Sequence, residues 1–162
     1  MKNITLFLIS VFIVSCSTQK VLKTDTQQDI DLSGRWNQTD AEIASSDLFN
    51  SLLASSWLKG YQAQNGLKPK IEILNFKSNF EDGGDDARMF FISYMKENSA
   101  FELIERKGRK VSDFQLSGNI LAEEFLTENQ NYIDYTFKTQ IRELSGEIMW
   151  EETTVVKKYI KD

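Results

Sequence analysis

Three long extended runs in the last third of the chain constrain its fold more than any other feature. Residues 114–127, 132–143 and 147–158 are separated only by short polar segments, as in strands that are joined by tight turns. In the middle run, the apolar residues of one face are Ile133, Tyr135, Phe137 and Ile141. Because successive side chains of a strand point to opposite faces, this alternation predicts one buried and one solvated face. We therefore expect an antiparallel meander in this part of the chain.

Helical periodicity precedes these runs in two places. Thr39, with Glu42 three residues later, predicts a capping box at the start of a helix over residues 40–59. The apolar stripe of this helix lies in two adjacent rows, formed by Ala44, Leu48 and Leu52 and by Phe49, Leu53 and Trp57. Residues 87–98 predict a second helix, with an apolar strip of Phe90, Phe91, Tyr94 and Met95. We interpret the first stripe as core rather than a cofactor site, and the second as able to lie on the sheet.

Two apolar runs flank the second predicted helix. Residues 70–76 fit a strand that is buried on both faces, and residues 101–105 fit a shorter strand. The order strand, helix, strand implies a right-handed crossover that places the two strands parallel. Together with the meander, this predicts an α+β two-layer sandwich, whose mixed four- to five-stranded sheet is flanked by at least two helices.

An acidic segment with two glycines, residues 81–86, comes directly before the second predicted helix. Its carboxylates could gather a calcium ion, but their spacing lacks the alternation and the distal glutamate of an EF-hand loop. A cap formed by Asp85 or Asp86 is the better interpretation, because negative charge also suits the N-terminal end of a helix dipole. We therefore predict no metal site.

The N-terminal segment predicts export and lipid attachment. Lys2 is followed by an apolar run over residues 4–14, which is too short to span a bilayer as a stable helix. Ser15 precedes Cys16, the only cysteine of the chain, in the order that a bacterial lipobox requires. We expect residues 1–15 to be a lipoprotein signal peptide and Cys16 to receive the lipid. The alternatives are a simple secretory signal with a chance cysteine, or a buried structural thiol.

The residues after Cys16 predict a short tether. The segment from 17 to 31 is polar and has no sustained apolar period, so we expect residues 16–31 to form a lipidated flexible tether and residues 32–162 a single globular domain. Such a tether spans roughly 50 Å at most. Ser17, in place of an aspartate after the cysteine, favours the outer membrane in the enterobacterial sorting scheme. We expect the domain to face the periplasm there.

Composition excludes several classes of function. The net charge is −5 and no basic face is concentrated in the sequence, so we expect no nucleic-acid partner. The chain has no histidine, which removes Ser-His-Asp and Cys-His nucleophilic systems and histidine-assisted zinc sites. Carboxylate pairs and Ser-Lys arrangements remain possible, but no spacing singles one out. We expect no catalytic residue, no cofactor and no enzymatic activity.

Several segments together resemble a known family. They are Leu-Ser-Gly-Arg-Trp-Asn-Gln-Thr-Asp at 32–40, Trp-Leu at 57–58, Lys-Pro at 68–69 before a strand that ends in Asn-Phe at 75–76, and Ser-Gly-Glu-Ile-Met-Trp at 145–150 with the lysine pair at 157–158. These segments are similar to the LpoB family of outer-membrane lipoproteins, which activate bifunctional penicillin-binding proteins. The resemblance implies a non-enzymatic regulator whose partner is a class A penicillin-binding protein. It also implies a mixed sheet flanked by helices, similar to the N-terminal domain of TolB.

The resemblance implies candidate partner-binding residues in the segment at 32–40. These are Arg35, Trp36 and Asp40, and tryptophan and arginine are residue types that dominate binding hot spots. The alternative is that Trp36 packs over the first helix and Arg35 pairs with a carboxylate. We expect Trp150 to be a core residue.

Two other classes of function remain open. One is an oligomerising structural or assembly lipoprotein, resembling the related curli-secretion domain, which would use exposed sheet edges or helices to associate. The other is an envelope hydrolase, which would require a pair of carboxylates in a cleft.

Overall fold

The computed structural model describes residues 35–104, 111–127 and 131–160. Residues 31–162 form one compact unit. The predicted signal peptide, Cys16 and the predicted tether at 16–31 lie outside the described residues, so these remain predictions.

The described residues form three helices and a six-stranded mixed sheet. The helices are α1 (Gln38–Ala54), α2 (Ser56–Asn65) and α3 (Gly83–Glu97). The strands are β1 (Lys70–Ile73), β2 (Lys77–Ser78), β3 (Glu102–Leu103), β4 (Phe114–Phe125), β5 (Asn131–Glu143) and β6 (Ile148–Ile160). Their order is β3-β1-β4-β5-β6, and β2 pairs with β4 beside this path.

The predicted α+β fold is confirmed. Strands β4, β5 and β6 pair antiparallel over nearly their whole lengths, as the meander predicted. Strands β1 and β3, which flank α3, pair parallel, as the crossover predicted. The sheet has one strand more than expected because the two residues of β2 pair with Asn119 and Ile120 of β4. So short a strand has no periodicity of its own for sequence reasoning to detect.

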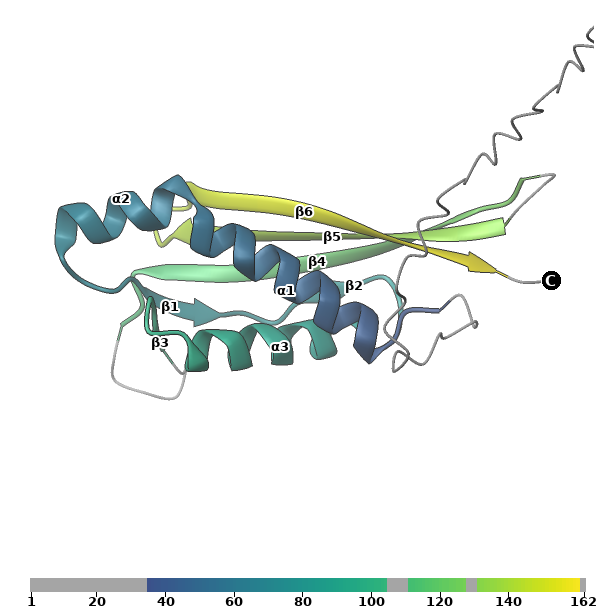
Figure 1. Ribbon diagram of the computed structural model, residues 1–162, viewed down its shortest axis with the longest axis horizontal. Helices are drawn as coiled ribbons and strands as arrows, with labels where there is room; N and C mark the ends of the chain where they lie inside the picture. The colour runs from purple at the N-terminus through teal and green to yellow at the C-terminus, as the bar shows by residue number, and fades with distance from the viewer. Residues whose placement is uncertain (1–34, 105–110, 128–130, 161–162) are drawn as a thin grey trace, which may run out of the picture. The chain divides into compact units, whose positions relative to one another are not determined.

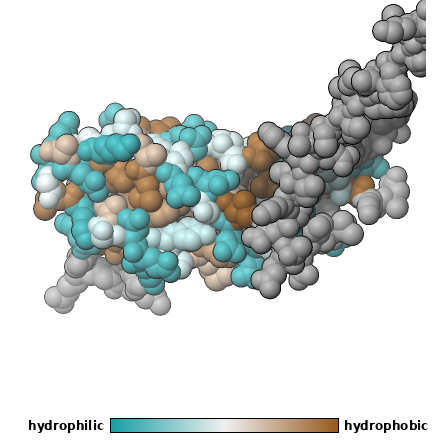
Figure 2. Space-filling model, viewed as in Figure 1, coloured by the Kyte–Doolittle hydropathy of each residue, from teal (hydrophilic) through white to brown (hydrophobic). Residues whose placement is uncertain are grey.

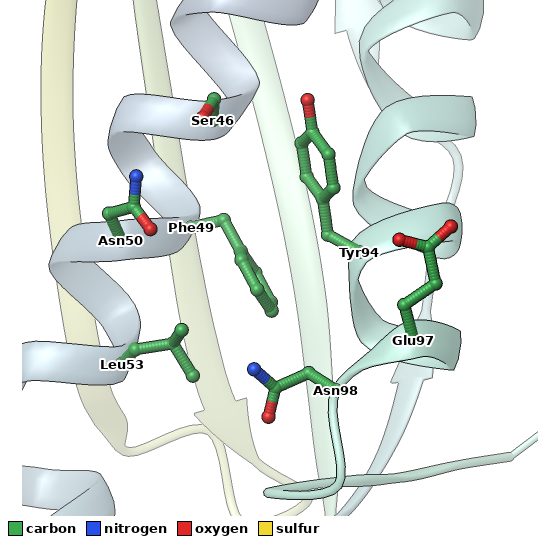
Figure 3. A pocket seen from close by; sticks show the side chains of 7 residues that line it. All are labelled: Ser46, Phe49, Asn50, Leu53, Tyr94, Glu97 and Asn98. Carbon is green, nitrogen blue, oxygen red and sulfur yellow. The ribbon is translucent and has the colours of Figure 1, made fainter.

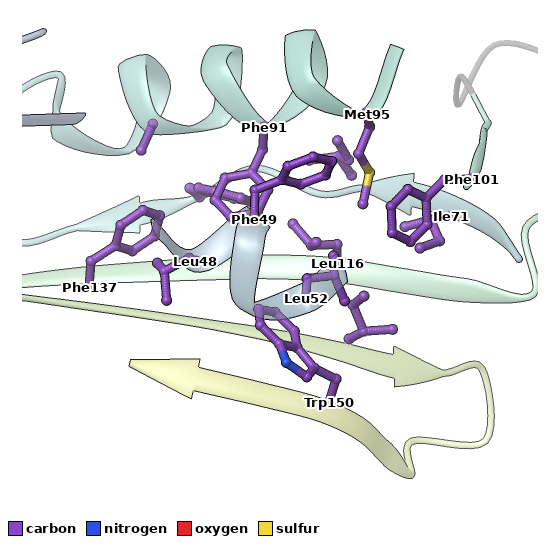
Figure 4. Close-up of a cluster of buried hydrophobic side chains, with 14 of the residues drawn as sticks. Leu48, Phe49, Leu52, Ile71, Phe91, Met95, Phe101, Leu116, Phe137 and Trp150 are labelled. Atoms are coloured by element: carbon purple, nitrogen blue, oxygen red, sulfur yellow. The ribbon is translucent and has the colours of Figure 1, made fainter. Parts of the chain in front are cut away.

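The core lies between the sheet and two helices that pack against each other, α1 and α3 (Figure 1). Figure 4 shows the buried side chains of this layer, among them Leu48, Phe49, Leu52, Phe91, Met95, Leu116, Phe137 and Trp150. The buried positions of β5 are alternate residues from Tyr135 to Ile141. The predicted burial of one face, and of Trp150, is therefore confirmed. Positions between them on β5 are half-buried or exposed, so the opposite face of this strand is open.

The predicted single helix over residues 40–59 is two helices. Ser55 has an extended backbone, with φ −62° and ψ 146°, and it ends α1 and caps α2. Its hydroxyl oxygen accepts a hydrogen bond from the N–H of Leu58 at 3.2 Å. Serine favours such caps because its side chain competes for backbone hydrogen bonds. The break turns Trp57 onto Phe114, with ring centroids 5.2 Å apart.

The caps predicted for both helices are also corrected. Helix α1 begins two residues earlier than expected, with Asn37 and Asp40 as its capping box rather than Thr39 and Glu42. Helix α3 begins at Gly83 after Asp82, which has a left-handed backbone and makes no side-chain cap.

Asp85 and Asp86 lie in the first turn of α3 instead of capping it, where their charge still suits the helix dipole. The glycines of this acidic segment allow the start of α3 to lie close to neighbouring residues. A Cβ added at Gly84 would lie 2.6 Å from the carbonyl oxygen of Phe76.

Strand β1 is shorter than the predicted strand over residues 70–76, and its side chains alternate between buried and half-buried. The prediction that both of its faces are buried was wrong, because the helices cover only one face. Phe76 follows the strand and is still part of the core.

Candidate functional site

The predicted binding residues lie near the N-terminal end of β5 and the C-terminal end of β6. The backbone N–H of Trp36 donates to the hydroxyl of Tyr135 at 3.0 Å. The indole of Trp36 packs against the rings of Tyr135 and Phe80, with centroids 5.3 Å and 6.1 Å away. Trp36 therefore packs within the fold, but against β5 and the loop before α3 rather than over the first helix as the alternative expected.

Asp40 lies at the same end and is held by two kinds of contact. Its carboxylate accepts the N–H of Asn37 at 3.0 Å in the capping box. The same oxygen pairs with Lys158 of β6 at 2.7 Å, and the two side chains are only 14% and 10% exposed. This pair fastens the start of α1 to the end of β6.

The three predicted binding residues differ in how far they are buried. Asp40 is engaged in the fold, Trp36 is half-buried, and Arg35 is exposed. The sequence placed all three in one segment, and the structure places Trp36 against β5 and Asp40 against β6, which are adjacent strands. Their role in binding a partner remains a prediction.

Sequence reasoning missed an aromatic row on the open face of the sheet at this end. Phe125, Tyr132 and Tyr159 are paired in register across β4, β5 and β6. The rings of Phe125 and Tyr132 stack 5.0 Å apart, and Tyr159 meets Tyr132 edge-on at 6.2 Å. Lys157 places its ammonium 3.7 Å from the centre of the Tyr132 ring.

This aromatic row remains accessible at its two outer members. Phe125 is 38% exposed and Tyr159 is 54% exposed. Exposed aromatic side chains are typical of interaction surfaces. The signal in the sequence was too weak to find the row, since the three residues are brought together only by the strand register.

A second candidate surface lies between α1 and α3. It is an open hollow of about 270 Å³ with a floor of Phe49, Leu53 and Tyr94 and polar groups at its rim, among them Asn50 and Asn98 (Figure 3). A neighbouring hollow of about 370 Å³ shares one wall with it. On the face shown in Figure 2, apolar residues form patches that polar residues separate. The mixed lining of the hollow between α1 and α3 offers both apolar contacts and hydrogen-bonding groups to another molecule.

Tyr94 is the titratable group of this hollow with a perturbed pKa. Burial raises the pKa of its hydroxyl above the ordinary value of 10.0, and the negative charge of Glu42 adds to the effect. The hydroxyl donates to the carbonyl oxygen of Glu42 at 3.5 Å. Tyr94 is therefore protonated at neutral pH and acts as a hydrogen-bond donor.

Two kinds of site were sought in the described part of the chain. Residues 35–104, 111–127 and 131–160 contain no group of three or more metal-ligating side chains placed to hold an ion. Among the same residues, no helix is long and apolar enough to cross a membrane.

Comparisons with known proteins give likeness only at the level of the fold. No family model matches the chain, and no curated protein matches it in sequence. Among solved structures, the chain is similar to lipoprotein GNA1162 from Neisseria meningitidis, at 8% identity over 56% of this chain and 83% of that one, with a TM-score of 0.44.

Two further structures show comparable similarity. The C-terminal domain of LpoB from Salmonella enterica is 11% identical over 63% of this chain and 98% of that one, with a TM-score of 0.39. The PelC dodecamer from Paraburkholderia phytofirmans is 16% identical over 57% of this chain and 74% of that one, with a TM-score of 0.38. An LpoB domain is thus among the solved structures to which this chain is similar.

Proposed function

We propose that this chain is a lipid-anchored protein of the bacterial envelope whose folded domain activates a peptidoglycan synthase without catalysing a reaction itself. The observation behind the anchor is Cys16, which directly follows a short apolar run and Ser15. After cleavage, an N-terminal cysteine with several acyl chains holds a protein stably at a membrane, whereas one chain does so only marginally. The polar segment at 16–31 then limits the reach of the domain to roughly 50 Å.

A binding role, rather than a catalytic one, is supported by what the polar groups of the domain contact. The charged pair between Asp40 and Lys158 joins α1 to β6, and the side chain of Arg88 donates to the carbonyl of Leu74 at 3.0 Å. These are structural contacts, and the chain has no histidine to serve as a general base. The exposed aromatic row and the hollow between α1 and α3 are surfaces that suit another protein.

The identity of the partner rests on the segments that resemble the LpoB family. The segment at 32–40 supplies Arg35 and Trp36, and the segment at 145–150 ends in Trp150, which is 8% exposed and belongs to the core. We propose a class A penicillin-binding protein as the partner and the outer membrane as the site of the anchor. Arg35 is the contact that we place first, because it is exposed and lies beside Trp36.

The anchor is tested with the full chain expressed in its own cells. We expect the unsubstituted chain to incorporate labelled palmitate and to remain in the membrane fraction, and Cys16→Ser to lose both properties. Labelling that persists in Cys16→Ser would contradict the lipidation.

The regulatory role is tested by co-purifying class A penicillin-binding proteins with the full chain, followed by a glycan-polymerisation assay. We expect binding and stimulation, and a loss of both in Arg35→Ala. Arg142→Ala is the matched control, because Arg142 lies at the opposite end of β5. Absence of both binding and stimulation with the unsubstituted chain would refute the role. Digestion of peptidoglycan by the purified protein would indicate an enzyme instead.

A further inference from the structure

Strand β6 forms one edge of the sheet and is unusually long for an edge. It spans 13 residues, Ile148–Ile160, and pairs with β5 on one side. In the part of the chain that the structure describes, no strand pairs with its other side. Val155 and Tyr159, both 54% exposed, lie on its open face. Long edges of this kind are templates for pairing with another chain, and proteins usually protect them with charge or cover.

The charges of β6 are arranged with two-fold complementarity. Glu151 lies three residues before Thr154 and Lys157 lies three residues after it, so the two charges share one face of the sheet. An antiparallel second copy that is centred on Thr154 therefore places its Lys157 opposite Glu151. Within one copy, Lys157 already pairs with Asp134 at 3.2 Å, and Glu151 pairs with Lys138 at 2.9 Å. Association thus extends each pair into a row of alternating charges that crosses four strands.

The charge pattern selects this register over its neighbours. A two-fold axis perpendicular to the sheet keeps paired side chains on one face. One residue, which we call the residue on the axis, must then lie directly opposite its own copy. With Thr153 on the axis, Glu151 would face Val155; with Val155 on the axis, it would face Tyr159. Parallel pairing in register would place like charges side by side, which is unfavourable. Only the register centred on Thr154 pairs Glu151 with Lys157.

The charges on the covered face are already used within one copy. Lys158 pairs with Asp40 at 2.7 Å, and Glu152 accepts a hydrogen bond from Ser51 of α1 at 2.9 Å. These contacts fix α1 beside β6 and do not depend on a second copy. The complementary charges available to another chain are therefore those of the open face.

We propose that two copies of this chain associate through β6, antiparallel and with Thr154 on the two-fold axis, into one continuous sheet. The occupant of the edge is a second copy because the strand is complementary to itself. This proposal does not depend on the identity of the peptidoglycan synthase, and failure of either leaves the other standing.

Disulfide cross-linking in membranes from cells that express the full chain tests the register. Directly opposed residues of antiparallel strands have Cα atoms about 4.5–5.5 Å apart, which is within disulfide range. Thr154→Cys should therefore form a cross-linked dimer on mild oxidation. Thr136→Cys is the matched control, since Thr136 lies one strand inward, opposite Val155, and about 16 Å from its own copy.

We expect at least tenfold more dimer from Thr154→Cys than from Thr136→Cys. The unsubstituted chain, which also contains Cys16, sets the background. Equal cross-linking of the two variants, or none at position 154, would overturn the proposed register.

Charge reversal with mixing distinguishes the interface from a folding defect. In Glu151→Lys, two positive side chains would face each other wherever the two copies meet. In Lys157→Glu, two negative side chains would do so. Each variant alone should therefore associate at least tenfold more weakly than the unsubstituted chain when its mass is measured in detergent. When the two variants are mixed, each positive side chain of one copy meets a negative side chain of the other. No like charges then face each other, so we expect mixed dimers.

The contacts that each substitution disturbs within its own copy are the same before and after mixing. Recovery on mixing can therefore come only from pairing between copies. Dimers that persist in each variant alone, or variants that fail to recover when mixed, would refute pairing through these charges.

Discussion

The ion pair between Asp40 and Lys158 fixes the end of the domain at which the chain enters, and its strength can be measured. The two substitutions are Asp40→Asn and Lys158→Met. The amide oxygen of the asparagine can still accept the N–H of Asn37, so the capping box keeps one of its hydrogen bonds. Methionine retains most of the apolar stem of lysine. Both substitutions therefore remove charge with little change of shape.

The expected magnitude follows from the geometry of the pair. The atoms Nζ and Oδ2 are 2.7 Å apart, and the side chains are 10% and 14% exposed. At an effective dielectric constant of about 20, charges at this separation attract by about 6 kcal/mol, and desolvation of the two ions offsets most of this. Breaking a fully buried pair costs about 3–5 kcal/mol, and exposed pairs contribute about 0–1 kcal/mol.

This pair lies between these limits. We expect each single substitution to lower the free energy of unfolding by about 2–3 kcal/mol, and the double substitution to cost no more than either single one. The coupling free energy of the double-mutant cycle is then about 2–3 kcal/mol.

Urea unfolding, followed by tryptophan fluorescence at one low protein concentration, measures this cycle. The control cycle is Lys138→Met with Glu151→Gln, a pair at 2.9 Å whose side chains are 47% and 37% exposed. We expect its coupling to stay below about 0.5 kcal/mol, because solvent screens it. Equal coupling in the two cycles, or additive effects at Asp40 and Lys158, would refute the view that burial strengthens the first pair.

Three further predictions concern the core, a cap and the hydroxyl of Tyr94. Gly118→Ala should lower the free energy of unfolding by about 1–3 kcal/mol in urea, because its Cβ would lie 2.6 Å from the ring of Phe76; an unchanged midpoint would contradict the close packing. Ser55→Ala should cost about 1 kcal/mol through loss of the cap on α2, whereas Ser55→Gly should cost less, and equal losses would count against a capping role. Burial raises the pKa of Tyr94, so its contribution to stability is complete below the ordinary value of 10.0 and is lost as pH rises through the higher folded value. Urea midpoints of Tyr94→Phe should therefore fall less than those of the unsubstituted protein above about pH 10, and parallel curves would rule this out.

The meander could be predicted because the pattern that identifies it lies in consecutive residues. Alternation along an extended run identifies a strand and assigns its faces at once, and β5 follows that pattern from Tyr135 to Ile141. The division of the first helix at Ser55 could not be predicted in this way, because the apolar spacing continues across the break. The position of α3 also depended on contacts from elsewhere, since Gly84 lies against the backbone of Phe76.

The candidate site likewise includes one prediction that rests on adjacent residues and others that depend on contacts between distant residues. The prediction for Cys16 uses only adjacent residues, so it needs no tertiary structure. The surroundings of Trp36 and Asp40 depend on Tyr135 and Lys158, which lie 99 and 118 residues further along the chain. No local pattern could show that Asp40 would be engaged in the fold while Arg35 would be exposed.

The anchor and the proposed pairing of β6 reinforce each other physically. Lys158 holds the start of α1 and lies four residues from Thr154, so the corresponding points of two paired copies would be about 26 Å apart along the strands. The predicted tethers, which would each reach roughly 50 Å, would allow both copies to be anchored in one membrane. Confinement to that membrane raises the effective concentration of one copy near the other, so an edge contact too weak to persist in dilute solution is populated there. Loss of the lipid in Cys16→Ser should therefore reduce cross-linking through Thr154→Cys even though β6 is unchanged.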